Sequence, residues 1–276
     1  MLIRKKTKIS ISIVTALVLL LTIAGPVSAA PAPKYDLVSL GDSLAWGQTP
    51  TVLGSTYYNQ DLSYTDIIAS KLSEENVLGS YTRFSGSGWT TVDLAAALCN
   101  PVNQPAILSP EIITIDIGAD DILAALKGVQ AANPGLDLAN VTSAQLSLLK
   151  PQISTTLNTS IPQVIVAINS IITQIQGVRA YNGIQPAQIY VMGYYNAFPF
   201  VSDNLEQVLA ANVVTFNTAL QGALTGIPNV SYVSTYESMD KHLIKYLPLD
   251  IHPTVPGYRT IAKCFLDEIL PDINLK

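Results

Sequence analysis

Cysteine and histidine are scarce in this sequence, with two residues of each among 276. Two cysteines cannot form the disulfide framework of a small cross-linked scaffold. We expect Cys99 and Cys264 to be separate, mostly buried thiols. The two histidines, His242 and His252, leave little choice for an imidazole base. A lone histidine is usually a surface residue or a satisfied core residue, and we interpret His242 in that way.

Basic residues are also few, with 15 Lys and Arg against 20 Asp and Glu. Four of the basic residues lie between positions 4 and 8, ahead of an apolar segment (9–25) and a run of small residues that ends at Ala29 and Ala30. This order is typical of a signal peptide, so we expect residues 1–30 to be removed and the protein to be secreted. The remaining chain has a formal charge of −9, which argues against a nucleic-acid partner.

Long apolar runs are absent after the first 30 residues, and no cysteine lies near the expected cleavage site. We therefore predict no stable membrane anchor after signal cleavage. Residues 31–276 are enough for one domain with a full core, and repeats, linkers and low-complexity tracts are missing from them. We expect a single domain and a monomer.

Short apolar segments alternate with helical patterns along this domain. Such alternation predicts an α/β fold, in which a mostly parallel five-stranded sheet is covered on both faces and binds ligands beyond the carboxyl ends of its strands. The expected strands are Leu37–Leu40, Tyr81–Phe84, Ile112–Ile117, Gln188–Gly193 and Val230–Ser234. The expected helices are Ser63–Leu72 with Ser63 as N-cap, Thr91–Leu98, one beginning with Ile122–Leu126, Ser143–Leu149, Gln163–Val178, Leu205–Leu224 and Tyr258–Leu270.

Two short stretches near opposite ends of the domain carry the residues for nucleophilic catalysis. The first strand runs directly into Gly41-Asp42-Ser43-Leu44, and Asp250-Ile251-His252-Pro253 precedes the last helix. A serine hydroxyl needs a base within hydrogen-bond reach, and the base needs a group that orients it. We predict Ser43 as nucleophile, His252 as base and Asp250 as the orienting acid.

With two further segments, Ser87-Gly88-Trp89-Thr90-Thr91 and Gly118-Ala119-Asp120-Asp121, the chain resembles the SGNH (GDSL) hydrolases. The resemblance implies a flavodoxin-like three-layer α/β/α sandwich and a serine esterase or lipase. The resemblance also implies that the enzyme needs neither a metal nor an organic cofactor. The implied substrate is a small-molecule, lipid or acylated-glycan ester. The backbone N–H groups of Ser43 and Gly88 would hold the oxyanion, with Asp120 at the third donor position.

Two features depart from the family pattern. Asp120 stands where the family has an asparagine, and an ionised carboxylate has no hydrogen to donate. Either burial and the adjacent Asp121 keep Asp120 protonated, or two backbone donors suffice, or the protein is a catalytically impaired relative that binds a glycan or surface polymer. In addition, Asp250 lies two residues before His252 rather than three, so a backbone carbonyl is the alternative orienting group.

Aromatic and polar residues after the strands are candidates for substrate contact. We predict Trp46, Trp89 and Asn196 in this role, and the following residues either line the same cleft or pack within loops: Tyr57, Tyr58, Tyr194, Tyr195, Phe198 and Phe200. Other sites are disfavoured. Asp116, Asp120 and Asp121 lack a cation-binding loop pattern. Thr91 replaces the third glycine of a dinucleotide loop, and Ala45 removes the Gly-x-Ser-x-Gly motif.

Overall fold

The computed structural model describes residues 33–50, 59–137, 140–248 and 250–274. The expected signal peptide (1–30) and the residues Tyr57 and Tyr58 lie outside this part of the chain. The chain from Lys34 to Lys276 forms one unit by its internal contacts.

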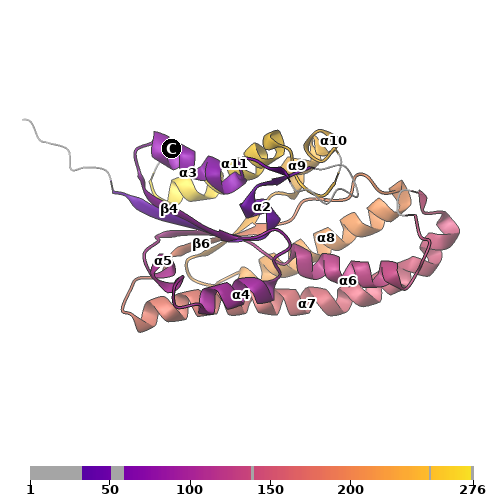
Figure 1. The fold of residues 1–276 in the computed structure, drawn as a ribbon, viewed down its shortest axis with the longest axis horizontal. Helices are drawn as coiled ribbons and strands as arrows, with labels where there is room; N and C mark the ends of the chain where they lie inside the picture. Colours follow the sequence, from indigo (N-terminus) through magenta and orange to yellow (C-terminus); the bar gives the residue numbers. More distant parts are fainter. Residues whose placement is uncertain (1–32, 51–58, 138–139, 249, 275–276) are drawn as a thin grey trace, which may run out of the picture. The chain divides into compact units, whose positions relative to one another are not determined.

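In the part of the chain that the structure describes, five strands form one parallel sheet (Figure 1). They are β1 (Tyr35–Gly41), β4 (Leu78–Ser85), β5 (Ile112–Asp116), β6 (Gln188–Gly193) and β7 (Val230–Ser234). Their spatial order is β4-β1-β5-β6-β7. The sequence order therefore reverses beside β1, as in flavodoxin-like folds, and the crevice outside the carboxyl ends of the strands is the usual ligand site. The short strands β2 (Gln48–Thr49) and β3 (Asn59–Gln60) pair antiparallel in a separate ribbon.

Side chains alternate between the two faces of the sheet, and each face has its own core. Leu37 packs in the core with α3 (Tyr64–Glu74) and α11 (Val255–Asp272). Val38 and Leu40 pack in the core with α4 (Thr91–Cys99), α7 (Ser143–Tyr181) and α8 (Asp203–Leu224). The result is the α/β/α sandwich predicted from the sequence, with helices above and below the strands in Figure 1.

The predicted helices begin close to their expected positions because their caps are encoded locally. Ser63 caps α3 through a reciprocal capping box with Asp66, as predicted. The last helix begins earlier than predicted, at Val255, with Pro256 in its first turn, where a missing N–H costs nothing. The remaining helices are α2 (Ser43–Trp46), α5 (Gln104–Leu108), α6 (Ala119–Ala131), α9 (Tyr236–Asp240) and α10 (Leu243–Tyr246).

The prediction of two separate helices, Ser143–Leu149 and Gln163–Val178, is wrong. One continuous helix, α7, passes through Pro151 and Pro162. Both prolines are exposed, while the opposite side of α7 carries a continuous buried stripe of Leu149, Ile153, Leu157, Ile161, Val164 and Ile168. Burial of this stripe outweighs the cost of each proline, about 3 kcal/mol. By length and composition α7 could also cross a membrane, but the stripe packs in the core.

Both cysteines are free, as predicted. They lie on helices that belong to different cores, because Cys99 ends α4 and Cys264 is in α11. The expectation that both are mostly buried is wrong for Cys99, which is exposed at the helix end and accepts a hydrogen bond from Gln174 (3.3 Å). Cys264 is partly buried.

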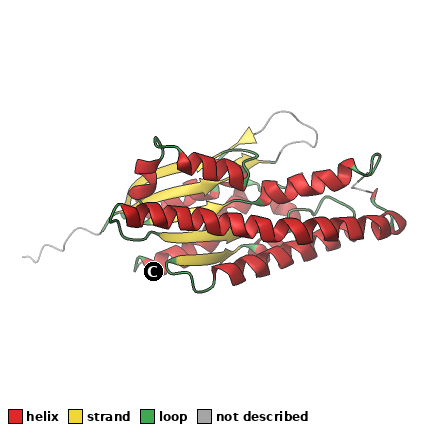
Figure 2. Ribbon diagram, turned by 90° about the horizontal axis from the view of Figure 1, so that it is seen from below, coloured by secondary structure: helices red, strands yellow, loops and turns green. Residues whose placement is uncertain are grey.

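Helices α6, α7 and α8 extend past the carboxyl ends of the strands, as Figures 1 and 2 show. The first half of α7 therefore packs against α6 and α8 rather than against the sheet. This extension places three apolar helix faces directly beyond the strand end that carries Ser43.

Candidate active site

Ser43 stands at the first position of α2, immediately after β1. The turn is tight: a Cβ at Gly41 would lie 2.1 Å from Asp116 Oδ1, so only glycine fits there. Oδ1 of the Asp42 carboxyl group accepts a hydrogen bond from the backbone N–H of Leu44 (3.0 Å) and caps α2. This local geometry holds the Ser43 side chain at the carboxyl edge of the sheet.

His252 reaches Ser43 across more than two hundred residues. Its Nε2 lies 3.0 Å from Ser43 Oγ, and its Nδ1 lies 3.2 Å from Asp250 Oδ1. The same Asp250 oxygen accepts the backbone N–H of His252 (2.7 Å). With hydrogen on Nδ1, the imidazole donates to Asp250 and accepts from the Ser43 hydroxyl. The structure thus brings together the three residues that the sequence predicts as nucleophile, base and orienting acid.

Sequence reasoning missed Gln48, which is buried next to this arrangement. Its Nε2 is 3.4 Å from His252 Nδ1, and its Oε1 accepts a hydrogen bond from Ser87 Oγ (2.6 Å). The Tyr258 hydroxyl donates to the Gln48 carbonyl. Gln48 is therefore hydrogen-bonded to the turn next to Gly88 and packs against the histidine; with hydrogen on Nδ1 both facing nitrogens are donors, so the 3.4 Å approach is a contact only. Its place just after Gly47 carries no motif that could have singled it out.

A second tyrosine fixes the loop that holds His252. The buried Tyr195 donates its hydroxyl to the backbone carbonyl of Ile251 (2.9 Å). Tyr195 follows β6, so this bond connects the histidine loop to the end of a core strand. The loop is therefore positioned by the sheet as well as by α11.

Gly88 and Asp120, the other predicted oxyanion residues, occupy different environments. Gly88 is exposed at φ +77°, a left-handed conformation that favours glycine. Asp120 is half-buried in the first turn of α6 and faces the same cavity as Ser43 and His252. Burial raises the pKa of Asp120, Lys127 and His252 oppose the rise, and Asp121 adds to it.

The Asp121 side chain is directed toward the start of α4. Its carboxylate accepts the backbone N–H of Thr91 (2.9 Å) and the Thr91 hydroxyl (2.8 Å), so it binds the start of α4 to the start of α6. Asp116 is buried and accepts from the Tyr64 hydroxyl (2.6 Å) and the Ala45 N–H (3.1 Å). Within the described ranges, no cluster of three or more His, Cys, Asp or Glu is arranged to hold a metal ion.

Two buried carboxyl groups lie behind the nucleophile. Burial and the Asp116 charge raise the pKa of Asp42 well above its ordinary value. Burial raises the pKa of Asp116 to about 7, although its hydrogen bonds favour the ionised form. The pair therefore retains a proton into the neutral range, and we place that proton on Asp42, because Asp116 is the one that accepts from Tyr64 and Ala45.

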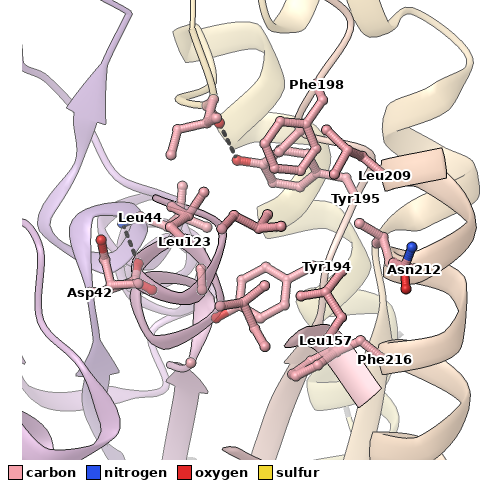
Figure 3. A pocket seen from close by; sticks show the side chains of 18 of the residues that line it. Asp42, Leu44, Leu123, Leu157, Tyr194, Tyr195, Phe198, Leu209, Asn212 and Phe216 are labelled. Atoms are coloured by element: carbon pink, nitrogen blue, oxygen red, sulfur yellow. Dashed lines mark hydrogen bonds between the residues drawn. The ribbon is translucent and has the colours of Figure 1, made fainter. Parts of the chain in front are cut away.

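An apolar cavity opens beside Ser43, and the empty space within it, open solvent included, is about 810 Å³. Figure 3 shows side chains that line it. Ser43, His252 and Asp120 stand among its lining residues, and Leu123, Leu157 and Leu209 from three helices form part of the wall. Tyr194, Tyr195 and Phe198 line it too, as the sequence allowed.

The three predicted substrate contacts are not among the residues that line this cavity. Asn196 is buried, donates to Glu206 and accepts from the N–H of Phe198 (3.2 Å), so its side chain holds a loop. Trp89 packs over its own turn, where a Cβ at Gly86 would lie 2.3 Å from the indole nitrogen. Trp46 is half-buried in α2. His242 is exposed, makes an edge-to-face contact with Tyr246, and is not among the residues that line this cavity.

Comparison with known proteins agrees with this geometry. The family model of GDSL-like lipase/acylhydrolases matches residues 39–260, which is most of the chain. The chain belongs to this family. Ester hydrolysis is the general activity of the GDSL family, and the matched region includes Ser43, Gly88, Asp120 and His252.

Solved structures share the fold at low sequence identity. The lipase Lip_vut3 from a goat rumen metagenome has a TM-score of 0.66 and 18% identity, covering 85% of this chain and 97% of that one. A catalytic mutant of Axe2, an acetylxylan esterase from Geobacillus stearothermophilus, has a TM-score of 0.57 and 16% identity, covering 89% and 96%. Among curated proteins, none matches. These neighbours establish the GDSL hydrolase fold.

Proposed function

We propose that this protein is a secreted serine esterase that hydrolyses carboxylic esters through a Ser43–His252–Asp250 triad and an acyl-enzyme intermediate. The observation that carries the proposal is the 3.0 Å contact between His252 Nε2 and Ser43 Oγ, continued by the 3.2 Å contact between Nδ1 and Asp250. Membership of the GDSL family supports ester hydrolysis as the reaction.

The mechanism follows from the positions of these atoms. Ser43 Oγ attacks the ester carbonyl carbon while His252 Nε2 takes the hydroxyl proton, and Asp250 stabilises the imidazolium that forms. The imidazolium then gives its proton to the leaving alcohol. Water attacks the acyl-Ser43 ester by the same route, which releases the carboxylic acid and restores the serine.

The oxyanion of the tetrahedral intermediate needs donors near Ser43. The first position of α2 presents the Ser43 backbone N–H, one of the N-terminal N–H groups without a partner inside the helix. The turn at Gly88 supplies the second N–H in this proposal. Asp120 supplies a third donor only when it is protonated, and burial raises its pKa, so that form persists to higher pH than for an ordinary aspartate.

The proposal is tested with p-nitrophenyl esters and three variants. We expect the wild type to hydrolyse at least one ester, and Ser43→Ala and His252→Ala each to lower kcat by at least about 10⁴-fold. His242→Ala is the matched control, because His242 is the exposed histidine, and it should retain full activity. Turnover that survives Ser43→Ala would show that the hydrolysis comes from another site.

The alternative function, an inactive relative that binds a glycan or surface polymer, rests on Asp120 alone. The raised pKa of Asp120 and the apolar lining of the cavity both favour a working esterase over glycan binding. We also propose secretion, on the signal-peptide pattern of residues 1–30.

A further inference from the structure

The cavity beside Ser43 continues past the residues that catalysis needs. A second apolar cavity, with about 760 Å³ of empty space when open solvent is included, adjoins it. The two share four wall residues, Leu123, Leu126, Phe198 and Leu209. The first cavity contains Ser43 and His252 at one end, whereas the second lies farther along α6, α7 and α8. Apolar space beyond the catalytic residues therefore lies along these three helices.

Away from Ser43, Asp120 and His252, the walls offer few groups for a polar ligand to bind; the buried Tyr194 hydroxyl is one of them. Tyr195 already donates to Ile251, and Asn212 donates to the Val208 carbonyl (2.7 Å) on its own helix. In the second cavity the polar lining residues are Lys127 and Gln130, both solvent-exposed on α6. A buried hydroxyl without a hydrogen-bond partner is strongly unfavourable, so a sugar does not suit this space.

An aliphatic chain suits it well. Each methylene moved from water to an apolar site improves binding by about fourfold. An acetyl group would occupy only the space next to Ser43 and leave most of the cavity unfilled. Of the two similar structures, one is a lipase and the other an acetylxylan esterase. The size and apolar lining of the cavity favour a substrate of the first kind for this chain.

We propose that the two cavities form one binding site for a medium- to long-chain fatty acyl group, with Leu126 and Leu209 at their junction. The inference rests on the proposed esterase function for the position of the carbonyl. The acyl chain runs from Ser43 between α6 and α8 toward Leu149 and Ile153 of α7, which line the second cavity. Fatty acyl esters, rather than acetylated glycans, are then the substrate class.

The test combines a chain-length series with substitutions at the junction. For p-nitrophenyl esters from acetate to dodecanoate, we expect kcat/KM to rise by at least roughly 100-fold between acetate and octanoate. Leu126→Trp fills the junction and should lower kcat/KM for dodecanoate by at least about tenfold, while acetate changes by less than about twofold. Leu123→Phe makes a smaller change at the same wall and serves if Leu126→Trp does not fold.

The matched control is Leu148→Trp, the same substitution at a solvent-facing position of α7 that is 71% exposed. It should leave the whole series unchanged. A preference for acetate, or a junction variant that lowers all chain lengths alike, would overturn the acyl site while leaving the esterase function in place.

A binding measurement separates the two proposals. Calorimetric titration of dodecanoate into Ser43→Ala should show binding that Leu126→Trp/Ser43→Ala loses. If no ester is hydrolysed but this binding is observed, the catalytic proposal fails and the acyl site stands. If dodecanoate does not bind, the acyl site is refuted whatever the activity.

Discussion

Asp250 makes two contacts with His252 through a single oxygen atom, one to the backbone N–H and one to the imidazole. This turn explains how an acid only two residues from the histidine can orient it. The sequence supplied both residues and left a backbone carbonyl as the alternative. The group that accepts the Nδ1 hydrogen depends on loop dihedral angles that no motif encodes. The position of Gln48 beside His252 also depends on such angles.

The first prediction concerns this contact. Asp250→Ala should lower kcat by about 10³-fold with a small change in KM, because the imidazole loses both its orientation and the charge that stabilises its protonated form. Single-turnover kinetics on a p-nitrophenyl ester measures the effect, and the thermal unfolding transition controls for misfolding. A loss of less than about tenfold would mean that another acceptor orients His252.

The second prediction concerns Asp120. Burial raises the pKa of its carboxyl group, so the protonated form persists to higher pH than usual and the oxyanion donor is lost as pH rises through that pKa. Asp120→Asn keeps a donor at every pH. The ratio of variant to wild-type kcat should therefore increase from about pH 5 to about pH 9, approaching 10²-fold at the alkaline end. A ratio that stays constant across this range would show that position 120 donates nothing to the oxyanion.

At the scale of elements, the strands and the capped helices were predictable because their signals are local. The apolar segment before Gly41 and the cap at Ser63 depend on neighbouring residues alone. The continuity of helix α7 was not predictable from local signals, because Pro151 and Pro162 locally favour helix ends. The buried stripe that overrides them depends on packing against α6 and α8. The cavity escaped prediction for the same reason, since its walls come from segments far apart in sequence.

The third prediction follows from the two prolines of α7. Pro162→Ala restores a backbone N–H in the middle of the helix and removes a clash with the preceding turn. We expect the free energy of unfolding to rise by about 1–3 kcal/mol, measured by urea denaturation. Gln163→Ala, at the exposed neighbouring position, is the control and should change it by less than about 0.5 kcal/mol. A destabilised Pro162→Ala would indicate that the proline itself sets the path of α7.

At the scale of the whole molecule, the buried pair Asp42–Asp116 makes stability depend on pH. Because folding raises both pKa values, that of Asp116 to about 7, the folded state binds more protons than the unfolded state. Stability is therefore full below the ordinary carboxyl pKa of 3.8 and decreases as pH rises through about 7. This dependence is opposite to that of a surface carboxylate in an ion pair.

The fourth prediction tests this pair with Asp42→Asn. Oδ1 of Asp42 accepts from Leu44, and the Asp42 side chain is hydrogen-bonded to Asp116. An amide in place of the carboxyl group can therefore donate to Asp116 at every pH while Oδ1 still caps α2. We expect the variant to lose less stability than the wild type between about pH 5 and about pH 8, by on the order of 1–3 kcal/mol. Urea denaturation at both pH values measures it. Parallel pH profiles for the two proteins would show that the pair holds no extra proton.

The last prediction addresses Ser43 as the activated nucleophile. A fluorophosphonate reacts with such a serine by forming an oxygen–phosphorus bond and releasing fluoride, while the histidine takes the hydroxyl proton. Peptide mass spectrometry of the labelled protein should find one adduct, on Ser43, which His242→Ala retains and His252→Ala abolishes. A folded protein that stays unlabelled, or one labelled at another serine, would contradict the account.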